Sequence, residues 1–271
     1  MAAGAPVDWS AVAGLSGAEA RALVRAGGWR QKTVGMAQGW VQANLVVLPA
    51  AHAAAFQQFC DRNAQACPVL DVTAPGSPEP RRVAAGADLR TDAPRYRVYR
   101  GGTVAAEVDS LVPYWRDDLV GFVLGCSFTF EAALARAGIP LRHMELGLTA
   151  PMYVTNRPCE AAGPFAGPLV VTMRPVPEGL VERASAVTAR FPRAHGAPVH
   201  VGDPAALGIA DLARPEWGDA VPVPPGDVPV FWACGVTPQA AAEAARLDLM
   251  LTHAPAHMFI TDLRVEDLED G

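Results

Sequence analysis

The chain has 271 residues, of which 51% are hydrophobic and only 18% are charged. A chain of this size and composition can bury a sizeable core in one large domain or in two smaller ones. Its 28 acidic residues exceed its 22 basic residues, which gives a formal net charge of −6. This balance argues against nucleic acid or an anionic membrane surface as a partner.

The apolar runs, the N-terminal residues and the cysteine spacing indicate where the protein functions and whether it carries disulfides. The apolar runs are strand-length and are broken by Gly, Pro or charge, so no segment is predicted to span a membrane. The N-terminal residues lack a basic stretch followed by an apolar one, which predicts a cytoplasmic protein. Five cysteines at scattered spacings favour reduced thiols over a disulfide framework or a zinc ribbon.

The first half of the chain alternates predicted helices and strands. Ser16 and Glu19 form a capping box, and Gly27 ends the helix that follows it. Residues 74–94 are rich in Pro, Gly, Arg and Asp, which predicts an exposed loop. Polar and apolar residues alternate on both sides of Gly101-Gly102, which indicates a hairpin. Further strands are predicted at 44–49, 69–72 and 119–125, and further helices at 52–63 and 128–137.

The second half continues the alternation and defines the expected fold class. Strands are predicted at 169–173, 198–201 and 228–233, and helices at 178–190 and 238–246. The pattern predicts an α/β fold with a mixed, partly parallel sheet and flanking helices, plus a smaller inserted α+β domain. We expect residues 1–164 and 226–271 to form the main domain, and residues 165–225 to form the smaller one.

Two strand-to-helix turns carry a cysteine beside a glycine. Cys126 follows Gly125, and Cys234 precedes Gly235. Such turns direct unpaired backbone N–H groups at one spot and favour a bound anion. We therefore expect a pocket for a small carboxylate, bound in part by Ser127, Gly235 and Thr237. A helix N-terminus lowers a thiol pKa, so each cysteine is a candidate nucleophile or base; the alternative is a small buried apolar side chain.

Histidines and a glutamate are the other catalytic candidates. Glu131 follows Cys126 closely, where it could act as a general acid or base or simply favour the helix dipole. His253 and His257 lie in one loop near the C-terminus, with Pro255 between them. We expect them to contribute polar groups to the pocket, or to be ordinary core or capping residues. A divalent metal held by His253, His257 and Asp262 is a weaker alternative.

Polar residues beside apolar runs or in loops are the candidate ligands of a substrate. Arg157 could hold a carboxylate through its two parallel N–H donors, although it could equally be an ordinary surface arginine. The remaining candidates are Gln42, Asn44, Asn156, His200 and Asp203. The chain has no phosphate-binding loop, no dinucleotide fingerprint and no serine nucleophile elbow, so no cofactor is identified.

Seven segments, in order along the chain, match one known family. They are GWVQANLVVLP at 39–49, DAPRYRVYRGG at 92–102, LVGFVLGCSFTFEAAL at 119–134, APMYVTNRPC at 150–159, HGAPVHVGDP at 195–204, VPVFWACGVTPQ at 228–239 and THAPAHMFITDL at 252–263. In these segments the chain resembles the D-glutamate cyclase family, whose bacterial members are often named as hydro-lyases. The resemblance runs from about residue 30 to the end of the chain.

This resemblance implies a function and a cellular setting. It implies a carbon–oxygen lyase that reversibly removes water from D-glutamate to give 5-oxo-D-proline. It also implies an α/β domain with a smaller α+β domain, in a cytoplasmic bacterial protein. The expected partner is a small carboxylate substrate, and a homo-oligomer is left open. Two alternatives remain: a carboxylate- or amino-acid-binding protein without turnover, and a hydro-lyase for another small hydroxy or amino acid.

Overall fold

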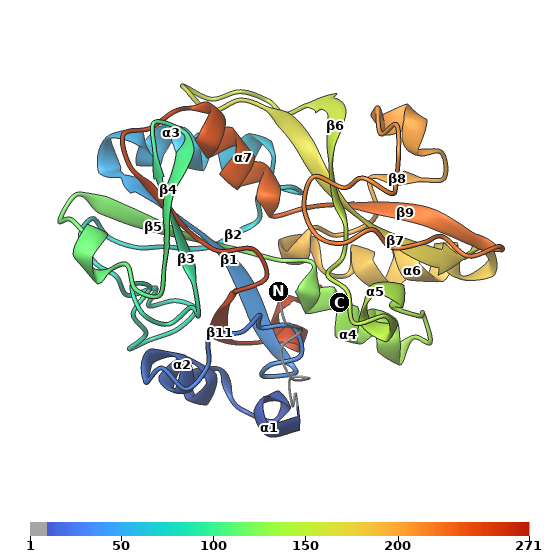
Figure 1. Ribbon diagram of the computed structural model, residues 1–271, viewed down its shortest axis with the longest axis horizontal. Coiled ribbons are helices and arrows are strands. Elements are labelled where there is room, and N and C mark those ends of the chain that lie inside the picture. Colours follow the sequence, from blue (N-terminus) through green and yellow to red (C-terminus); the bar gives the residue numbers. More distant parts are fainter. Residues whose placement is uncertain (1–9, 271) are drawn as a thin grey trace.

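The computed structural model describes residues 10–270 and contains two β-sheets with helices packed around them (Figure 1). The first sheet contains β1 (Trp40–Pro49), β2 (Val69–Val72), β3 (Tyr96–Arg100), β4 (Thr103–Val108), β5 (Leu119–Leu124), β10 (Met250–His253) and β11 (Phe259–Arg264). The second contains β6 (Met152–Pro158), β7 (Pro168–Pro177), β8 (His200–Val201) and β9 (Asp227–Ala233). The helices are α1 (Ser10–Ala13), α2 (Gly17–Arg25), α3 (Ala50–Arg62), α4 (Phe128–Arg136), α5 (Arg142–Glu145), α6 (Val181–Ala189) and α7 (Val236–Ala244). None of these helices is both long and apolar enough to cross a bilayer.

The mixed α/β architecture agrees with the sequence, but the expectation of partly parallel pairing is wrong. The first sheet has the order β2-β5-β1-β10-β3-β4, with β11 beside β1, and the second has the order β6-β7-β9-β8. All strand pairs in residues 10–270 are antiparallel. The helix α3 does connect two strands that run in the same direction, β1 and β2. However, β5 lies between them and runs the opposite way, so the two never pair.

The two cysteine turns are the places where the chain passes between the sheets. Strand β5 ends in the first sheet, and the chain continues through α4 and α5 to β6 of the second. Strand β9 ends in the second sheet, and the chain returns through α7 to β10 of the first. The strands of the second sheet thus come from residues 152–233. The division into two domains at 165–225 remains a prediction.

Helices α4 and α7 pack on opposite faces of the first sheet. Alternate side chains of a strand point to opposite faces, and in β1 Leu45 belongs to the core that contains Phe130 of α4. Its neighbour Val46 belongs to a separate core that contains Ala241 of α7. In Figure 1, α7 lies in the upper part of the view and α4 lies in the lower part.

Local predictions from turn and cap residues are confirmed where short-range chemistry decides them. The Ser16 N–H donates to Glu19 Oε2 at 2.8 Å and Ser16 Oγ accepts from the Glu19 N–H, which completes the capping box of α2. The hairpin at Gly101-Gly102 is formed by β3 and β4. Strands β2, β5 and β9 and helices α3 and α4 lie within one or two residues of their expected bounds.

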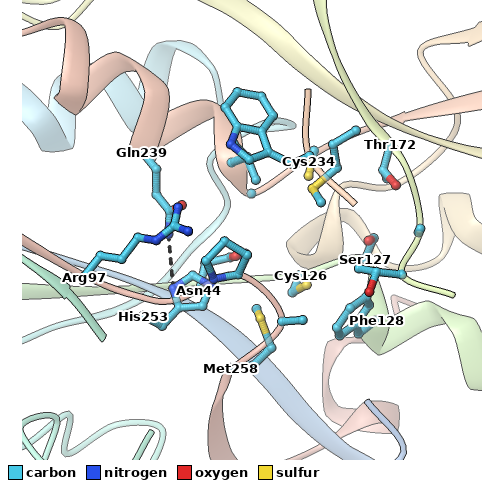
Figure 2. A pocket seen from close by; sticks show the side chains of 18 of the residues that line it. Asn44, Arg97, Cys126, Ser127, Phe128, Thr172, Cys234, Gln239, His253 and Met258 are labelled. Carbon is cyan, nitrogen blue, oxygen red and sulfur yellow. Dashed lines mark hydrogen bonds between the residues drawn. The ribbon is translucent and has the colours of Figure 1, made fainter. Parts of the chain in front are cut away.

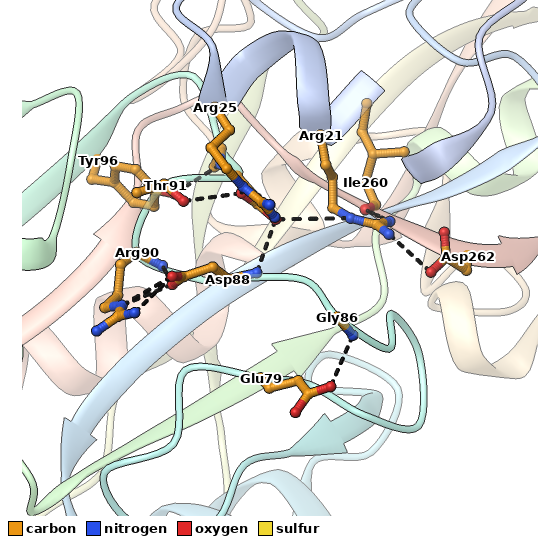
Figure 3. Close-up of polar contacts among 12 residues, drawn as sticks. Arg21, Arg25, Glu79, Gly86, Asp88, Arg90, Thr91, Tyr96, Ile260 and Asp262 are labelled. Carbon is orange, nitrogen blue, oxygen red and sulfur yellow. Dashed lines mark hydrogen bonds and ion pairs between the residues drawn. The ribbon is translucent and has the colours of Figure 1, made fainter. Parts of the chain in front are cut away.

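Residues 74–94 lack helix or strand as expected, but their predicted exposure is wrong. Leu89 is fully buried in the core of the first sheet. The fully buried carboxylate of Asp92 accepts two hydrogen bonds from Arg25 of α2, at 2.7 and 2.6 Å, and one from the Asp88 N–H. Figure 3 labels Arg25 and Asp88 in this group of polar contacts. The segment therefore packs into the fold, and the ion pair between Arg25 and Asp92 attaches it to α2. Residues 1–9, on which the expectation of no targeting segment rests, lie outside the described residues.

Candidate functional site

The two cysteine turns have the same backbone geometry and open into one pocket. The Thr129 N–H donates to the Cys126 carbonyl at 3.0 Å, and the Thr237 N–H donates to the Cys234 carbonyl at 2.9 Å. Each turn thus has the form Cys-x-x-Thr, with the helix beginning inside it. Figure 2 shows both cysteine side chains in the same pocket.

The pocket lies where residues from both sheets and both helices meet. The space between its walls measures about 680 Å³, which includes space open to solvent. Its lining residues are Asn44, Arg97, Tyr99, Cys126, Ser127, Phe128, Thr149, Ala150, Met152, Thr172, Trp217, Cys234, Gly235, Val236, Gln239, Glu243, His253, Pro255, Ala256 and Met258. This set mixes apolar walls with a few convergent polar groups, as is typical of small-molecule sites.

Both helices begin at the pocket without a side-chain cap. Neither Ser127 at the start of α4 nor Gly235 at the start of α7 makes a capping hydrogen bond. The first N–H groups of a helix need partners, and they favour negative charge. The pocket therefore offers two backbone sites for an anionic or partly anionic oxygen.

Asn44 of β1 connects the two turns. Its Nδ2 donates to the Gly125 carbonyl at 2.8 Å, immediately before the first cysteine. The same side chain fills the space beside Gly235, where an added Cβ would lie 1.9 Å from Asn44 Nδ2. Glycine is therefore required at 235 by close approach, and Asn44 holds the two turns at a fixed separation.

Burial sets the protonation of the two thiols. Cys126 and Cys234 are each 8% exposed. Burial raises the pKa of Cys126 to about 12 and that of Cys234 to about 11, while hydrogen bonds from the Phe128 and Val236 N–H groups and the nearby Arg174 charge act in the opposite direction. The expected lowering of these pKa values is wrong, because desolvation outweighs the helix N-terminus. Both groups are thiols at neutral pH.

A buried ion cluster lies behind Ser127. Arg174 of β7 pairs with Glu131, and its Nη2 also donates to Ser127 Oγ at 3.2 Å. His143 Nε2 lies 3.1 Å from Glu131 Oε1. Burial acts to raise the pKa of Glu131, but the Arg174 charge and the His143 hydrogen bond outweigh it and lower it to about 2. Glu131 is thus an ionised partner of Arg174 outside the pocket lining, and it does not face a ligand there.

His253 presents a hydrogen-bond donor to the pocket. Its Nδ1 accepts from the Leu45 N–H at 3.1 Å and lies 3.1 Å from Gln239 Nε2 (Figure 2). Burial lowers the pKa of His253 to about 4, so the ring is neutral above that pH. A backbone N–H can only donate, so Nδ1 is the acceptor and the proton of the neutral ring resides on Nε2.

The structure does not bring His253, His257 and Asp262 together as a set of metal ligands. His257 Nδ1 is bonded to the Pro255 carbonyl at 2.8 Å, and His257 is absent from the pocket lining. Asp262 lies on β11 and accepts from Arg21 Nη2 at 2.9 Å. No three His, Cys, Asp or Glu side chains between residues 10 and 270 are grouped so that they could hold a metal ion.

Two predicted ligand residues are buried next to the site but do not line the pocket. Gln42 Nε2 donates to the carbonyls of Thr33 and Met36, at 2.9 and 3.1 Å. Thr237 Oγ1 accepts from the Val170 N–H at 3.1 Å and fixes α7 to β7. Both side chains support neighbouring backbone.

Four other candidates lie in the second sheet or just after its strand β8, away from the pocket lining. Asn156 and Arg157 are exposed near the end of β6, where Arg157 Nη1 donates to the Val199 carbonyl at 3.1 Å. His200 Nε2 lies 2.8 Å from the Asp203 carbonyl, and Asp203 Oδ1 accepts from a following backbone N–H at 2.9 Å. The short-range contacts of His200 and Asp203 are typical of turns.

Several polar lining residues are absent from the sequence-based candidates, among them two pairs on β3 and α7. Arg97 and Tyr99 lie on β3, and Gln239 and Glu243 lie one helical turn apart on α7. Burial and then the Glu243 charge raise the pKa of Tyr99 to about 12. The spacing of Gln239 and Glu243 after the second turn could have revealed them, since residues four apart share a helix face. No local signal marks Arg97, because the pairing of β3 with β10 brings it to the site.

Comparison with known proteins identifies the family. The model of the D-glutamate cyclase family matches residues 120–262, from β5 to β11. The chain belongs to the D-glutamate cyclase family. Both cysteine turns lie within the matched region, as does the ion cluster of Glu131, His143 and Arg174.

Bacterial proteins with hydro-lyase names are similar over nearly the whole chain. A protein of Rubrobacter xylanophilus is 59% identical over 252 residues, which cover 93% of this chain and 97% of the relative. A protein of Geobacillus kaustophilus is 56% identical over 254 residues, covering 94% and 97%. Both carry the name "Putative hydro-lyase". A solved nitrogen repressor-like protein of Methanococcus jannaschii aligns over 94% of the chain at 11% identity, but its TM-score of 0.40 supports no conclusion.

The buried histidines predict a loss of stability in mild acid. Burial lowers the pKa values of both His195 and His253 to about 4, below the ordinary value of 6.5. Between pH 6.5 and pH 4 the unfolded chain therefore binds protons that the folded chain excludes, and the free energy of unfolding falls as pH falls through this range. The full shift corresponds to about 3 kcal/mol for each histidine.

Urea denaturation between pH 7.5 and pH 4.5 measures this loss. The variant His253→Gln is expected to weaken the dependence on pH, because one of the two groups is removed. An unfolding free energy that stays constant from pH 7 to pH 4.5 in the wild-type protein would contradict the assignment.

Proposed function

We propose that this protein interconverts D-glutamate with 5-oxo-D-proline and water. The observation that carries the proposal is the charge pattern of the pocket, which offers a cation, an anion and two helix N-termini within one space. Membership of the D-glutamate cyclase family and the hydro-lyase names of the bacterial relatives support the same reaction.

The charged groups of the pocket complement an acidic amino acid. D-glutamate carries two carboxylates and one ammonium group. Arg97 Nε donates to Glu107 Oε1 at 2.7 Å, and the N–H donors on its two Nη atoms suit one substrate carboxylate. The uncapped N-termini of α4 and α7 suit the other carboxylate. Glu243 is the acidic side chain of the pocket lining and suits the ammonium group.

The cyclisation requires a base that deprotonates the ammonium group, hydrogen-bond donors for the oxyanion, and an acid that protonates the leaving oxygen. The amine nitrogen attacks the γ-carboxyl carbon, a C–N bond forms, and one C–O bond breaks. The two protons lost from nitrogen end on the leaving oxygen, which departs as water. Glu243 is placed to take a proton from the ammonium group, and the first N–H groups of α4 or α7 can stabilise the tetrahedral oxyanion. His253 Nε2–H adds a neutral donor, and a thiol of the cysteine turns can protonate the departing oxygen.

Chiral chromatography tests the reaction directly. The purified protein is incubated separately with D-glutamate, L-glutamate and 5-oxo-D-proline, and each mixture is analysed for both enantiomers of both compounds. The proposal expects conversion of D-glutamate and 5-oxo-D-proline toward one equilibrium mixture. A ligand-dependent rise in melting temperature without any product would instead indicate a binding protein, and would refute the proposal.

Replacing Arg97 tests the carboxylate contact. Arg97→Gln is expected to raise KM for D-glutamate by about 10- to 100-fold, because hydrogen bonds to charged groups contribute roughly 1.5–3 kcal/mol. Steady-state kinetics across a range of D-glutamate concentrations measures the change. Arg100→Gln is the matched control, since Arg100 is exposed at the end of the same strand and does not line the pocket. Equal kinetics for Arg97→Gln and wild type would remove Arg97 from the site.

A further inference from the structure

The two pocket thiols stand before helices that pack on opposite faces of the first sheet. Cys126 precedes α4 and Cys234 precedes α7, and these helices belong to separate cores on the two sides of β1. Both thiols line the pocket, and Cys126 lies close enough to Cys234 for the charge of Cys234 to act on it. A flat ligand centre bound between the helix N-termini would therefore meet one thiol on each of its two faces (Figure 2).

The polar surroundings of the thiols suit chemistry at a carbon next to a carboxylate. The uncapped N–H groups beside each cysteine can stabilise the charge that develops on a carboxylate when the neighbouring carbon loses a proton. Arg174 lies behind Ser127, and its charge acts on both thiols in favour of the thiolate. Both groups are thiols at neutral pH, so one of them must lose its proton before it acts as a base, and the Arg174 charge favours that loss while the other stays protonated.

We propose that Cys126 and Cys234 form an acid–base pair that removes and returns the Cα proton of the bound amino acid or lactam from opposite faces, so that the protein also exchanges and inverts this centre. The inference rests on the proposed function for its substrate class, an α-amino acid or its lactam. It adds a second activity at the same pocket, a 1,1-proton transfer, to the loss of water.

The proton transfer balances without any redox partner. The pair enters the step as one thiolate and one thiol, after one proton has left to solvent. The thiolate sulfur takes the Cα proton, so the Cα–H bond breaks, an S–H bond forms, and the electron pair moves into the carboxylate to give an enediolate. The other thiol then gives its proton to the opposite face of Cα and becomes the thiolate. The protonation of the pair is exchanged and Cα is inverted.

Proton NMR in D₂O, combined with chiral chromatography, measures both activities in the same samples. The wild-type protein is incubated separately with both enantiomers of glutamate and of 5-oxoproline. We expect the Cα–H signal to disappear and the opposite enantiomer to appear, with deuterium in the newly formed enantiomer at early times. Incorporation of deuterium only into the starting enantiomer would overturn the two-thiol pair, and this result needs no variant.

Single replacements separate the two thiols. Cys126→Ala and Cys234→Ala are each expected to lose inversion by at least about 100-fold, the scale of one general acid or base. The thiol that remains still exchanges the proton on its own face, so each variant is expected to exchange one enantiomer, and the two variants opposite ones. Cys126→Ser and Cys234→Ser repeat the test with smaller changes in packing. Cys60→Ala is the control, because Cys60 is buried in α3 and does not line the pocket.

The outcomes distinguish this inference from the proposed function. Cyclisation without exchange at Cα overturns the thiol pair and leaves the cyclase reaction standing. Exchange and inversion without cyclisation support the thiol pair and refute the proposed function. A protein with neither activity on these four acids refutes both. Inversion at the wild-type rate in a folded cysteine variant also overturns the pair.

Discussion

Arg174→Met is expected to destabilise the protein by about 3–5 kcal/mol, because it leaves the buried Glu131 carboxylate without its cation. Arg174 is 1% exposed and lies over the rings of Phe130 and Trp232, so the replacement also removes packing. Urea denaturation at pH 7.5 measures the free energy of unfolding. The same variant is expected to lose activity, since Ser127 at the start of α4 loses its bond to the guanidinium.

A double variant separates charge from packing at this cluster. Arg174→Met combined with Glu131→Leu removes both ions, and we expect it to recover most of the stability lost in the single variant. Arg116→Met is the matched control, since the Arg116–Asp118 pair is about half exposed and is worth less than about 1 kcal/mol. A double variant that is no more stable than Arg174→Met would show that packing, and not the unpaired carboxylate, dominates the loss.

Gly235→Ala is expected to reduce kcat/KM by about 100-fold or more. The new Cβ would lie 1.9 Å from Asn44 Nδ2 and 2.5 Å from its Cγ, so the Asn44 side chain must move. Its hydrogen bond to the Gly125 carbonyl is then lost, and the two cysteine turns shift relative to one another. Displacement of about 1 Å in a catalytic site can cost two orders of magnitude in rate. Steady-state kinetics with D-glutamate and 5-oxo-D-proline measures the loss.

Thermal unfolding of a companion variant tests whether the collision is the cause. Gly235→Ala/Asn44→Ala relieves the contact, so we expect it to melt at a higher temperature than Gly235→Ala alone. Gly179→Ala is the control, because nothing lies within 4 Å of its added Cβ. If the Gly235→Ala protein retains wild-type kinetics, Asn44 is not the spacer between the turns.

The sequence predicts features that depend on residues close together in the chain, and it does not predict those that depend on residues far apart. The capping box at Ser16, the hairpin at Gly101-Gly102 and the strand–cysteine–helix turns are set by residues a few positions apart, and they were predicted close to their true bounds. The order of the strands is set by long-range pairing. Nothing near β1 or β2 indicates that β5, some fifty residues later, lies between them.

The residues of the candidate site show the same difference between local and long-range interactions. Cys126, Ser127, Cys234 and Gly235 reach one pocket because each belongs to a local turn that ends at the junction of the sheets. Arg97 reaches it only because β3 pairs with β10, and no short pattern reports that pairing. Five further candidates, Gln42, Asn156, Arg157, His200 and Asp203, had the right chemistry but are committed to other backbone or surface contacts.

The starts of α4 and α7 both lack a side-chain cap. Ser127 Oγ makes no capping hydrogen bond and Gly235 has no side chain, so the leading N–H groups of each helix meet the carbonyl and the thiol of the preceding cysteine in place of a cap side chain. A bound carboxylate would serve as the missing cap for both helices at once. The ligand then completes the secondary structure that holds it, and it ties together the two chain segments that join the sheets. A ligand in the pocket would therefore make both of these connecting segments more rigid.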